Sequence, residues 1–198
     1  MPTLYVICGC NGAGKTTASY TILPEMLQCR DFVNSDEIAR GIAPFDPAHA
    51  AIDAGRVMLK RIHELTEAKQ DFAFETTLAV RSYAKLLERT KMKGYTIMLI
   101  YFWLSSPQIA VTRVRKRINA GGHSIPENVI QRRYWAGIDN LFHLYMPLCD
   151  RWLLINNSET PSTLIAEGVG TKVEKIFSES DYQTLIDISQ NLPQGLDE

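Results

Sequence analysis

Cysteine is scarce in this sequence, and the few that occur are poorly spaced for a metal site. Of the 198 residues only four are cysteine, at positions 8, 10, 29 and 149. The pair Cys8 and Cys10 does not have a usual zinc-ligand spacing, and no cluster of histidine and cysteine completes a site. We therefore expect buried or half-buried free thiols rather than a zinc centre.

The chain also lacks an excess of charge and a long apolar run. Its 21 basic and 22 acidic residues leave a formal net charge of −1, which gives no general attraction to nucleic acid or to an acidic membrane surface. The longest apolar stretch, residues 95–104, is interrupted by Thr96 and is too short to cross a membrane. The first residues lead directly into an expected strand, which predicts no signal peptide. We therefore expect a cytoplasmic protein with no membrane partner.

Internal repeats and low-complexity segments are absent as well, which excludes a solenoid or a disordered tract. What is present is an alternation of strand and helix signals, typical of an α/β fold with a parallel sheet covered by helices on both faces. The length fits one domain over residues 1–198 with a substantial core. About five parallel strands are expected, at residues 4–8, 32–33, 71–78, 95–104 and 151–157. A C-terminal extension over residues 158–198 is expected to add two short strands, at residues 163–167 and 173–177, and a last helix at residues 182–190.

One long helix is expected over residues 48–69, because Asp46-Pro47 gives a start signal and apolar residues recur along it. Its expected core residues are Ile52, Val57, Leu59, Ile62 and Leu65.

A phosphate-binding loop follows the first expected strand. The segment Gly9-Cys10-Asn11-Gly12-Ala13-Gly14-Lys15-Thr16 matches the pattern of a glycine, four residues and then Gly-Lys-Thr. The glycines let backbone N–H groups point at an anion, and the dipole of the following helix adds to the attraction. Lys15 suits the β- and γ-phosphates of ATP, and the hydroxyl of Thr16 suits Mg²⁺. The residues expected at the nucleotide are Gly9, Asn11, Gly12, Ala13, Gly14, Lys15, Thr16 and Thr17.

Two acidic residues lie near the carboxyl ends of the expected second and third strands. Asp36 comes just after residues 32–33, and Glu75 lies where the third apolar run stops. Both are therefore expected at the carboxyl edge of the sheet, where ligands of open α/β proteins gather. The strand at residues 95–104 carries no terminal aspartate, so the acid that usually supports the metal is missing there. Asp36 and Glu75 are the candidates to replace it.

A simpler interpretation of Asp36 stays open at this point. Asn34 or Ser35 can cap the short helix that begins here. Asp36 and Glu37 would then only complement the positive end of that helix.

Two arginine-bearing helices joined by glycines resemble a lid over residues 113–134. The first carries Arg113 and Arg117 on one face, four residues apart. It ends at residues 119–122, where Gly121-Gly122 would act as a hinge. The second carries Arg132 and Arg133, which point about 100° apart, so only one is expected to face a ligand. Such a lid would close on phosphates; the alternative is a solvated basic face on a helical hairpin.

Together these motifs resemble the zeta toxin family, in its short branch of predicted ATPases. The resemblance covers roughly residues 3–157 and rests on the phosphate loop and three further segments. These are Phe32-Val33-Asn34-Ser35-Asp36-Glu37-Ile38-Ala39, Phe72-Ala73-Phe74-Glu75-Thr76-Thr77-Leu78, and Arg117-x-x-x-Gly121-Gly122-His123-x-Ile125-Pro126-Glu127 followed by Arg132-Arg133-Tyr134.

The resemblance implies a P-loop kinase fold in which ATP phosphorylates the sugar of UDP-N-acetylglucosamine, with a possible antitoxin protein as partner. By the same resemblance, Lys15 and Thr16 hold phosphates and Mg²⁺, Asp36 is the general base, and the lid arginines bind phosphates. Glu75 and Thr77 would lie on the acceptor side.

Two other functions remain open from the sequence. One is a kinase of a different hydroxyl, in a nucleotide, a metabolite or a nucleic-acid end, although no basic groove is seen outside the lid. The other is a non-catalytic nucleotide switch, which would not need Asp36.

Overall fold

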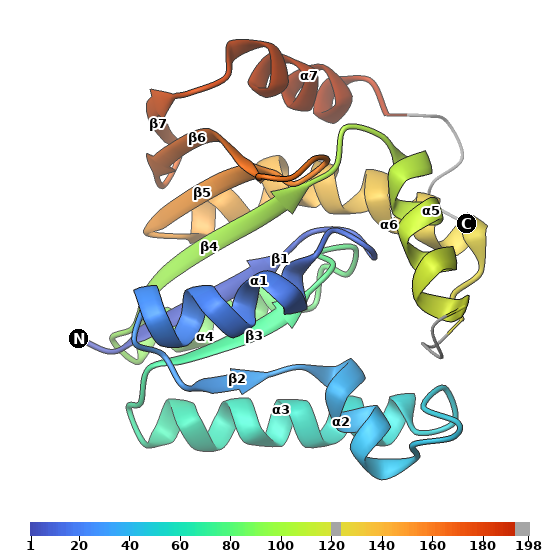
Figure 1. The fold of residues 1–198 in the computed structure, drawn as a ribbon. Helices are drawn as coiled ribbons and strands as arrows, with labels where there is room; N and C mark the ends of the chain where they lie inside the picture. Colours follow the sequence, from blue (N-terminus) through green and yellow to red (C-terminus); the bar gives the residue numbers. More distant parts are fainter. Residues whose placement is uncertain (120–123, 193–198) are drawn as a thin grey trace.

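The computed structural model describes residues 1–119 and 124–192 (Figure 1). Its strands are β1 Thr3–Cys8, β2 Asp31–Val33, β3 Phe72–Thr76, β4 Thr96–Trp103, β5 Arg151–Asn156, β6 Thr163–Val169 and β7 Lys172–Ile176. Its α-helices are α1 Lys15–Thr21, α2 Ser35–Ile42, α3 Ala51–Glu67, α4 Tyr83–Met92, α5 Pro107–Asn119, α6 Glu127–Asn140 and α7 Glu179–Gln190. A π-helical turn, Ile22–Met26, continues α1, and a π-helical turn and a 3₁₀ turn, Leu141–Tyr145 and Met146–Leu148, continue α6.

The strands form one sheet in the order β2-β3-β1-β4-β5-β6-β7. The first five are parallel, which confirms the expected α/β architecture. Helices cover both faces, with α1 in front of the sheet and α4 behind it in the view of Figure 1. The carboxyl ends of β1 to β4 point to the same edge, where the loop after β1 and the start of α2 lie.

The described residues form seven strands instead of about five. The two short strands expected in the C-terminal extension join the same sheet, because β6 pairs antiparallel with β5 and β7 pairs antiparallel with β6. Antiparallel neighbours need only a tight turn. Gly170, with a positive φ of 53°, lies in the turn between β6 and β7. Helix α7 contacts both β6 and α6, so the extension packs against the helix that carries Arg133.

Strand β4 lies in the middle of the sheet, as its continuous apolar sequence predicts. Its last five residues are buried. The Trp103 indole N–H donates to the Tyr134 hydroxyl at 3.1 Å, and that hydroxyl donates to the Leu104 carbonyl at 2.8 Å. These two bonds fasten α6 to the carboxyl end of β4, next to the loop after β1.

Helix α3 forms where it was expected, but it presents a different face to the core. Ile52, Val57 and Leu59 are exposed, at 73%, 46% and 52% of their surface, whereas Ile62 and Leu65 are buried as predicted. The buried stripe is completed by Ala54 and Met58, which follow the 3.6-residue period of a helix packed on one side only. A helix beside the edge strand β2 buries a narrow stripe, and the remaining apolar residues stay at the surface.

No helix in residues 1–119 or 124–192 has both the length and the apolar character needed to span a bilayer.

Candidate active site

The loop after β1 has the backbone conformation of a phosphate loop. Gly9 has a φ of +138°, and a Cβ placed on it would lie 2.2 Å from the carbonyl oxygen of Phe102. Gly14 has a φ of 82° and forms the N-cap of α1 without a side-chain cap, so the first N–H groups of this helix are left for a ligand. The loop is held from β5 by Asn157, whose amide donates to the Ala13 carbonyl at 2.7 Å.

Lys15 is held inside the loop by two contacts. Its ammonium donates to the Cys10 carbonyl at 3.0 Å and lies 3.4 Å from a carboxylate oxygen of Glu75. The residue is only 6% exposed. A desolvated ammonium with these partners has a fixed position, which suits a group that must meet phosphate oxygens.

Thr16 and Glu75 meet at the mouth of the loop. The Thr16 hydroxyl donates to Glu75 Oε2 at 2.7 Å, and the Asn34 amide donates to the same oxygen at 2.9 Å. Of the two acids considered as a substitute for the missing acid at the end of β4, Glu75 is therefore the one in contact with Thr16. Its side chain is 11% exposed.

Asp36 lies in the first turn of α2, at the carboxyl edge of the sheet. The cap of this helix is Asn34, whose Oδ1 accepts from the backbone N–H groups of Asp36 at 2.8 Å and Glu37 at 3.4 Å. The Asp36 carboxylate is therefore not needed as a cap, and Asp36 lines the cavities at the loop instead.

Two cavities meet beside the phosphate loop. The larger, of about 660 Å³, has among its lining residues Gly12, Gly14, Thr16, Thr17, Arg113 and Arg117. The smaller, of about 200 Å³, is lined by Thr77, Val80, Tyr83 and Arg133. Four residues line both cavities: Asn11, Lys15, Asp36 and Glu75.

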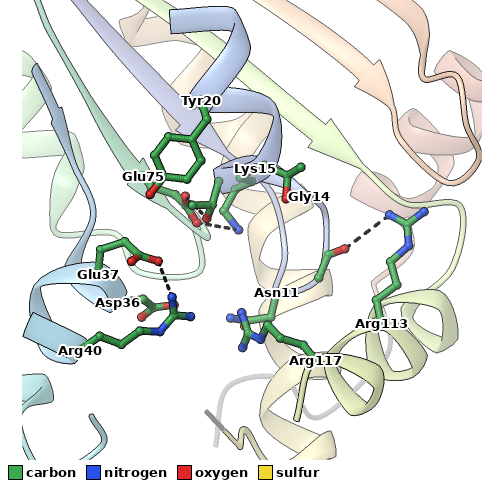
Figure 2. Close-up of a pocket in the computed structure, with 13 residues that line it drawn as sticks. Asn11, Gly14, Lys15, Tyr20, Asp36, Glu37, Arg40, Glu75, Arg113 and Arg117 are labelled. Carbon is green, nitrogen blue, oxygen red and sulfur yellow. Dashed lines mark hydrogen bonds and ion pairs between the residues drawn. The ribbon is translucent and has the colours of Figure 1, made fainter. Parts of the chain in front are cut away.

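Figure 2 shows the larger cavity with its two walls. Asp36, Glu37 and Arg40 reach into it from α2, Arg117 points toward them from α5, and Arg113 turns its guanidinium toward the loop. Glu37 and Arg40 form an ion pair at 2.6 Å on the α2 side.

The two cavity-lining arginines of α5, Arg113 and Arg117, differ in their hydrogen bonding. Arg113 donates to the Ser158 carbonyl at 2.8 Å and to the Gly12 carbonyl at 3.5 Å, so it braces the loop against the segment after β5. Arg117 has a buried Nε atom with no hydrogen-bond partner among the described residues. A buried, unsatisfied donor is costly, and the residue that carries it lines the larger cavity.

The two arginines of α6 also differ. Arg133 donates to the Asn11 side chain at 3.2 Å and lines the smaller cavity. Burial lowers its guanidinium pKa; the nearby Asp36 raises it, and the positive charge of Arg132 lowers it further. Arg132 itself is exposed on a different side of the helix and lines neither cavity. The expected Gly121-Gly122 hinge lies outside the described residues.

A magnesium ion bound together with a nucleotide fits the groups present. In the parts of the chain that the structure describes, no group of three or more His, Cys, Asp or Glu side chains is placed to hold a metal ion. Magnesium needs no such cage, because it usually keeps several waters and binds through one or two protein groups plus substrate phosphates. The hydroxyl of Thr16 beside the carboxylate of Glu75 supplies such a pair.

Sequence reasoning did not assign a site role to Asn34, Tyr20 or Arg40. Asn34 was predicted as a possible helix cap, but its second contact, with Glu75, joins two strands and has no local signal. Tyr20 lies one helical turn after Thr16 and lines the larger cavity; helical spacing alone could have placed it there.

The family is decided by a sequence profile described as Zeta toxin, which matches residues 1–144. The chain belongs to the zeta toxin family. An uncharacterized protein of Haemophilus influenzae (strain Rd) is 32% identical over 127 residues, covering 64% of this chain and 89% of that protein.

Several solved structures have the same fold as the present chain. The AvrRxo1-ORF1:ORF2 complex with ATP has a TM-score of 0.77 at 14% identity, over 98% of this chain and 66% of that one, so the present chain spans just under two thirds of its length. The PezAT toxin–antitoxin system of Streptococcus pneumoniae has a TM-score of 0.68 at 16% identity, over 98% and 81%. A sugar kinase from Janibacter sp. HTCC2649 has a TM-score of 0.52 at 16% identity, over 81% and 88%. The fold is therefore that of P-loop kinases, and family and fold together support an ATP-dependent, kinase-like function.

Proposed function

We propose that this chain is an ATP-dependent kinase that transfers the γ-phosphate to a hydroxyl group of a small molecule. The observation that carries the proposal is the junction of the two cavities. Asp36, Lys15 and Glu75 line both the larger cavity at the phosphate loop and the smaller cavity beside it. A carboxylate at the boundary between a nucleotide site and a second pocket is where phosphoryl transfer needs a base.

In this proposal the triphosphate lies on the N–H groups of the loop, in the larger cavity. Lys15 neutralises the β- and γ-phosphates, and Arg117, which lines the same cavity, binds phosphate oxygens through its guanidinium. Arg133 reaches the transferred group from the opposite side, next to Asn11. Arg113 keeps the loop in place through its carbonyl contacts.

The acceptor hydroxyl would lie in the smaller cavity, against Asp36. As its oxygen bonds to the γ-phosphorus, the bond between that phosphorus and the oxygen bridging to ADP breaks. The hydroxyl proton passes to the Asp36 carboxylate, and ADP leaves with the bridging oxygen. Thr16 and Glu75 would hold Mg²⁺, which when bound neutralises charge on the β- and γ-phosphate oxygens.

The acceptor that the family resemblance favours is a UDP-sugar such as UDP-N-acetylglucosamine. The smaller cavity, about 200 Å³, is below the roughly 300–1,000 Å³ of a complete small-molecule site. We therefore expect it to take the reacting sugar ring, beside Thr77, with the nucleotide part of the acceptor outside it. By analogy with the PezAT toxin–antitoxin system, an antitoxin protein is the proposed protein partner.

The test is the labelled product. The protein is incubated with ATP labelled in the γ-phosphate and Mg²⁺, first with UDP-N-acetylglucosamine and then with a fractionated metabolite extract. We expect label in a phosphorylated sugar nucleotide, and none with the Lys15→Ala variant. A different labelled product would correct the acceptor. Binding of ATP with no labelled product from any source would refute the kinase and favour a nucleotide switch.

A further inference from the structure

Asn34 occupies a position between three parts of the site. It follows β2, precedes α2 and is only 6% exposed. Its side chain contacts the start of α2 with one end and the Thr16–Glu75 pair with the other. No other residue in the described parts of the chain bonds both the helix that carries Asp36 and the acid on β3.

The orientation of this amide follows from its partners. Oδ1 accepts from the backbone N–H groups of Asp36 and Glu37, and a backbone N–H can only donate. The opposite end must therefore be the NH₂ group, which lies 2.9 Å from Glu75 Oε2 and 3.4 Å from Thr16 Oγ1. The helix cap thus determines which end of Asn34 faces Glu75.

This orientation controls what Glu75 and Thr16 can do. Glu75 Oε2 receives two donors, Asn34 and the Thr16 hydroxyl, while Oε1 lies next to Lys15. Because the single hydroxyl proton of Thr16 points at Glu75, its oxygen can only accept from other groups; one lone pair faces the Asn34 NH₂ at 3.4 Å, and the other is available to a cation. Without the amide, Glu75 keeps its attraction to Lys15, and the Thr16 hydroxyl becomes the one remaining donor to Oε2 among the described residues, so the carboxylate is held less firmly against Thr16.

We propose that Asn34 is a positioning residue of the nucleotide–magnesium site. It holds Glu75 against Thr16 and fixes α2, with Asp36, at the same point. The proposal rests on the proposed function, because it requires that ATP and Mg²⁺ bind at the loop. Groups that orient metal ligands in this way contribute about 10–100-fold to metal affinity or activity.

The test separates the cap from the contact with Glu75. Asn34→Ser keeps an oxygen that caps a helix as well as asparagine does, but it lacks an N–H that reaches Glu75. Asn34→Gly is the second variant, since glycine is tolerated at an N-cap with little loss of stability. Asn140→Ser is the control, because Asn140 is equally buried and donates to the Leu78 carbonyl at 2.8 Å, away from Thr16.

The measured quantity is the gain in affinity for a non-hydrolysable ATP analogue when Mg²⁺ replaces a chelator, determined by calorimetry. Turnover is not required for this measurement. We expect the gain to fall about tenfold or more in Asn34→Ser and Asn34→Gly, and to stay at the wild-type value in Asn140→Ser. Glu75→Gln should cause a similar fall. The double variant Asn34→Ser/Glu75→Gln should lose little more, because both changes break one unit.

Each result decides the proposal. A wild-type gain in both Asn34 variants would make Asn34 a helix cap only. Losses that add fully in the double variant would mean that Asn34 does not act through Glu75. If Mg²⁺ gives no gain in the wild-type protein, the proposed nucleotide–magnesium function itself fails, and this inference falls with it. Melting temperatures in chelator show whether the variants fold, and they should lie close to the wild-type value for Asn34→Ser.

Discussion

Replacing Asp36 by asparagine tests the base without disturbing the helix. In a chain where Asp36 capped α2, asparagine would cap equally well and activity would survive. In this structure the cap is Asn34, and the backbone N–H of Asp36 is already satisfied at 2.8 Å. The substitution therefore removes a charge and a proton acceptor at the junction of the two cavities, and leaves the hydrogen bonds of the helix start in place.

Two magnitudes follow. The lost interaction of a first-turn acid with the helix dipole is about 0.3–1 kcal/mol, and 1 kcal/mol lowers the melting temperature of a chain of this size by about 2–4 °C. The loss of a positioned general base lowers turnover by about 10²–10⁴. A small change in stability with a large change in rate is the expected signature.

The assay is the transfer of labelled phosphate at saturating ATP, together with calorimetric ATP affinity and thermal melting. The matched control is Asp53→Asn, since Asp53 is also a first-turn acid, lies on α3 and pairs with Arg56 in the open. It should show the same small change in melting temperature and unchanged turnover. If Asp36→Asn keeps wild-type turnover, Asp36 only complements the helix dipole, and the assignment of the base is wrong.

Three further changes test other parts of the site. Arg117→Lys keeps the positive charge but loses the two-pronged guanidinium, so we expect turnover to fall more than ATP affinity, and full activity would show that the phosphate contact lies elsewhere. The control Arg115→Lys, at an exposed ion pair on the same helix, should leave both turnover and affinity unchanged. Gly9→Ala puts a Cβ against a backbone carbonyl at a φ of +138°, so we expect the unfolding free energy to fall by at least about 1–3 kcal/mol and ATP binding to be lost. An unchanged urea midpoint would contradict the loop geometry. Burial raises the pKa of Cys10 from 9.0 to about 11 and that of Cys149 to about 12. The unfolded chain therefore releases these protons at lower pH than the folded one, so the thiol contribution to the unfolding free energy should be constant below about pH 8 and fall from pH 9 to 12. The measurement is the urea unfolding free energy of Cys149→Ala against that of the unsubstituted chain, and a difference between the two that stays constant from pH 9 to 12 would show that the Cys149 thiol is not buried.

The phosphate loop was predictable because all of its parts are contiguous. A glycine pattern between a strand and a helix determines the turn, the free N–H groups and the place of Thr16 with no help from the rest of the chain. The cap at Asn34 is equally local, since a short polar side chain at the end of a strand finds the next N–H groups by itself. The parallel sheet could be predicted for a related reason, because few arrangements of alternating strands and helices bury the apolar faces of both kinds of element.

The tertiary structure decided which side chains meet. Only the parallel pairing of β1 and β3 brings Glu75 to Thr16, which is 59 residues away in sequence. The tertiary structure also distinguishes Arg113 from Arg117, because the carbonyl of Ser158 accepts a hydrogen bond from the first, whereas Nε of the second has no partner among the described residues.

The rotation of each helix about its own axis could not be predicted from the sequence either. The adjacent Arg132 and Arg133 carry the same chemistry, and it is the packing of α6 on the end of β4 that turns the second toward Asn11. The same holds for α3, where an apolar residue such as Ile52 is left exposed because the helix buries a single narrow stripe. Sequence determines what each segment offers, whereas pairing and rotation, which depend on the whole core, determine which groups share a cavity.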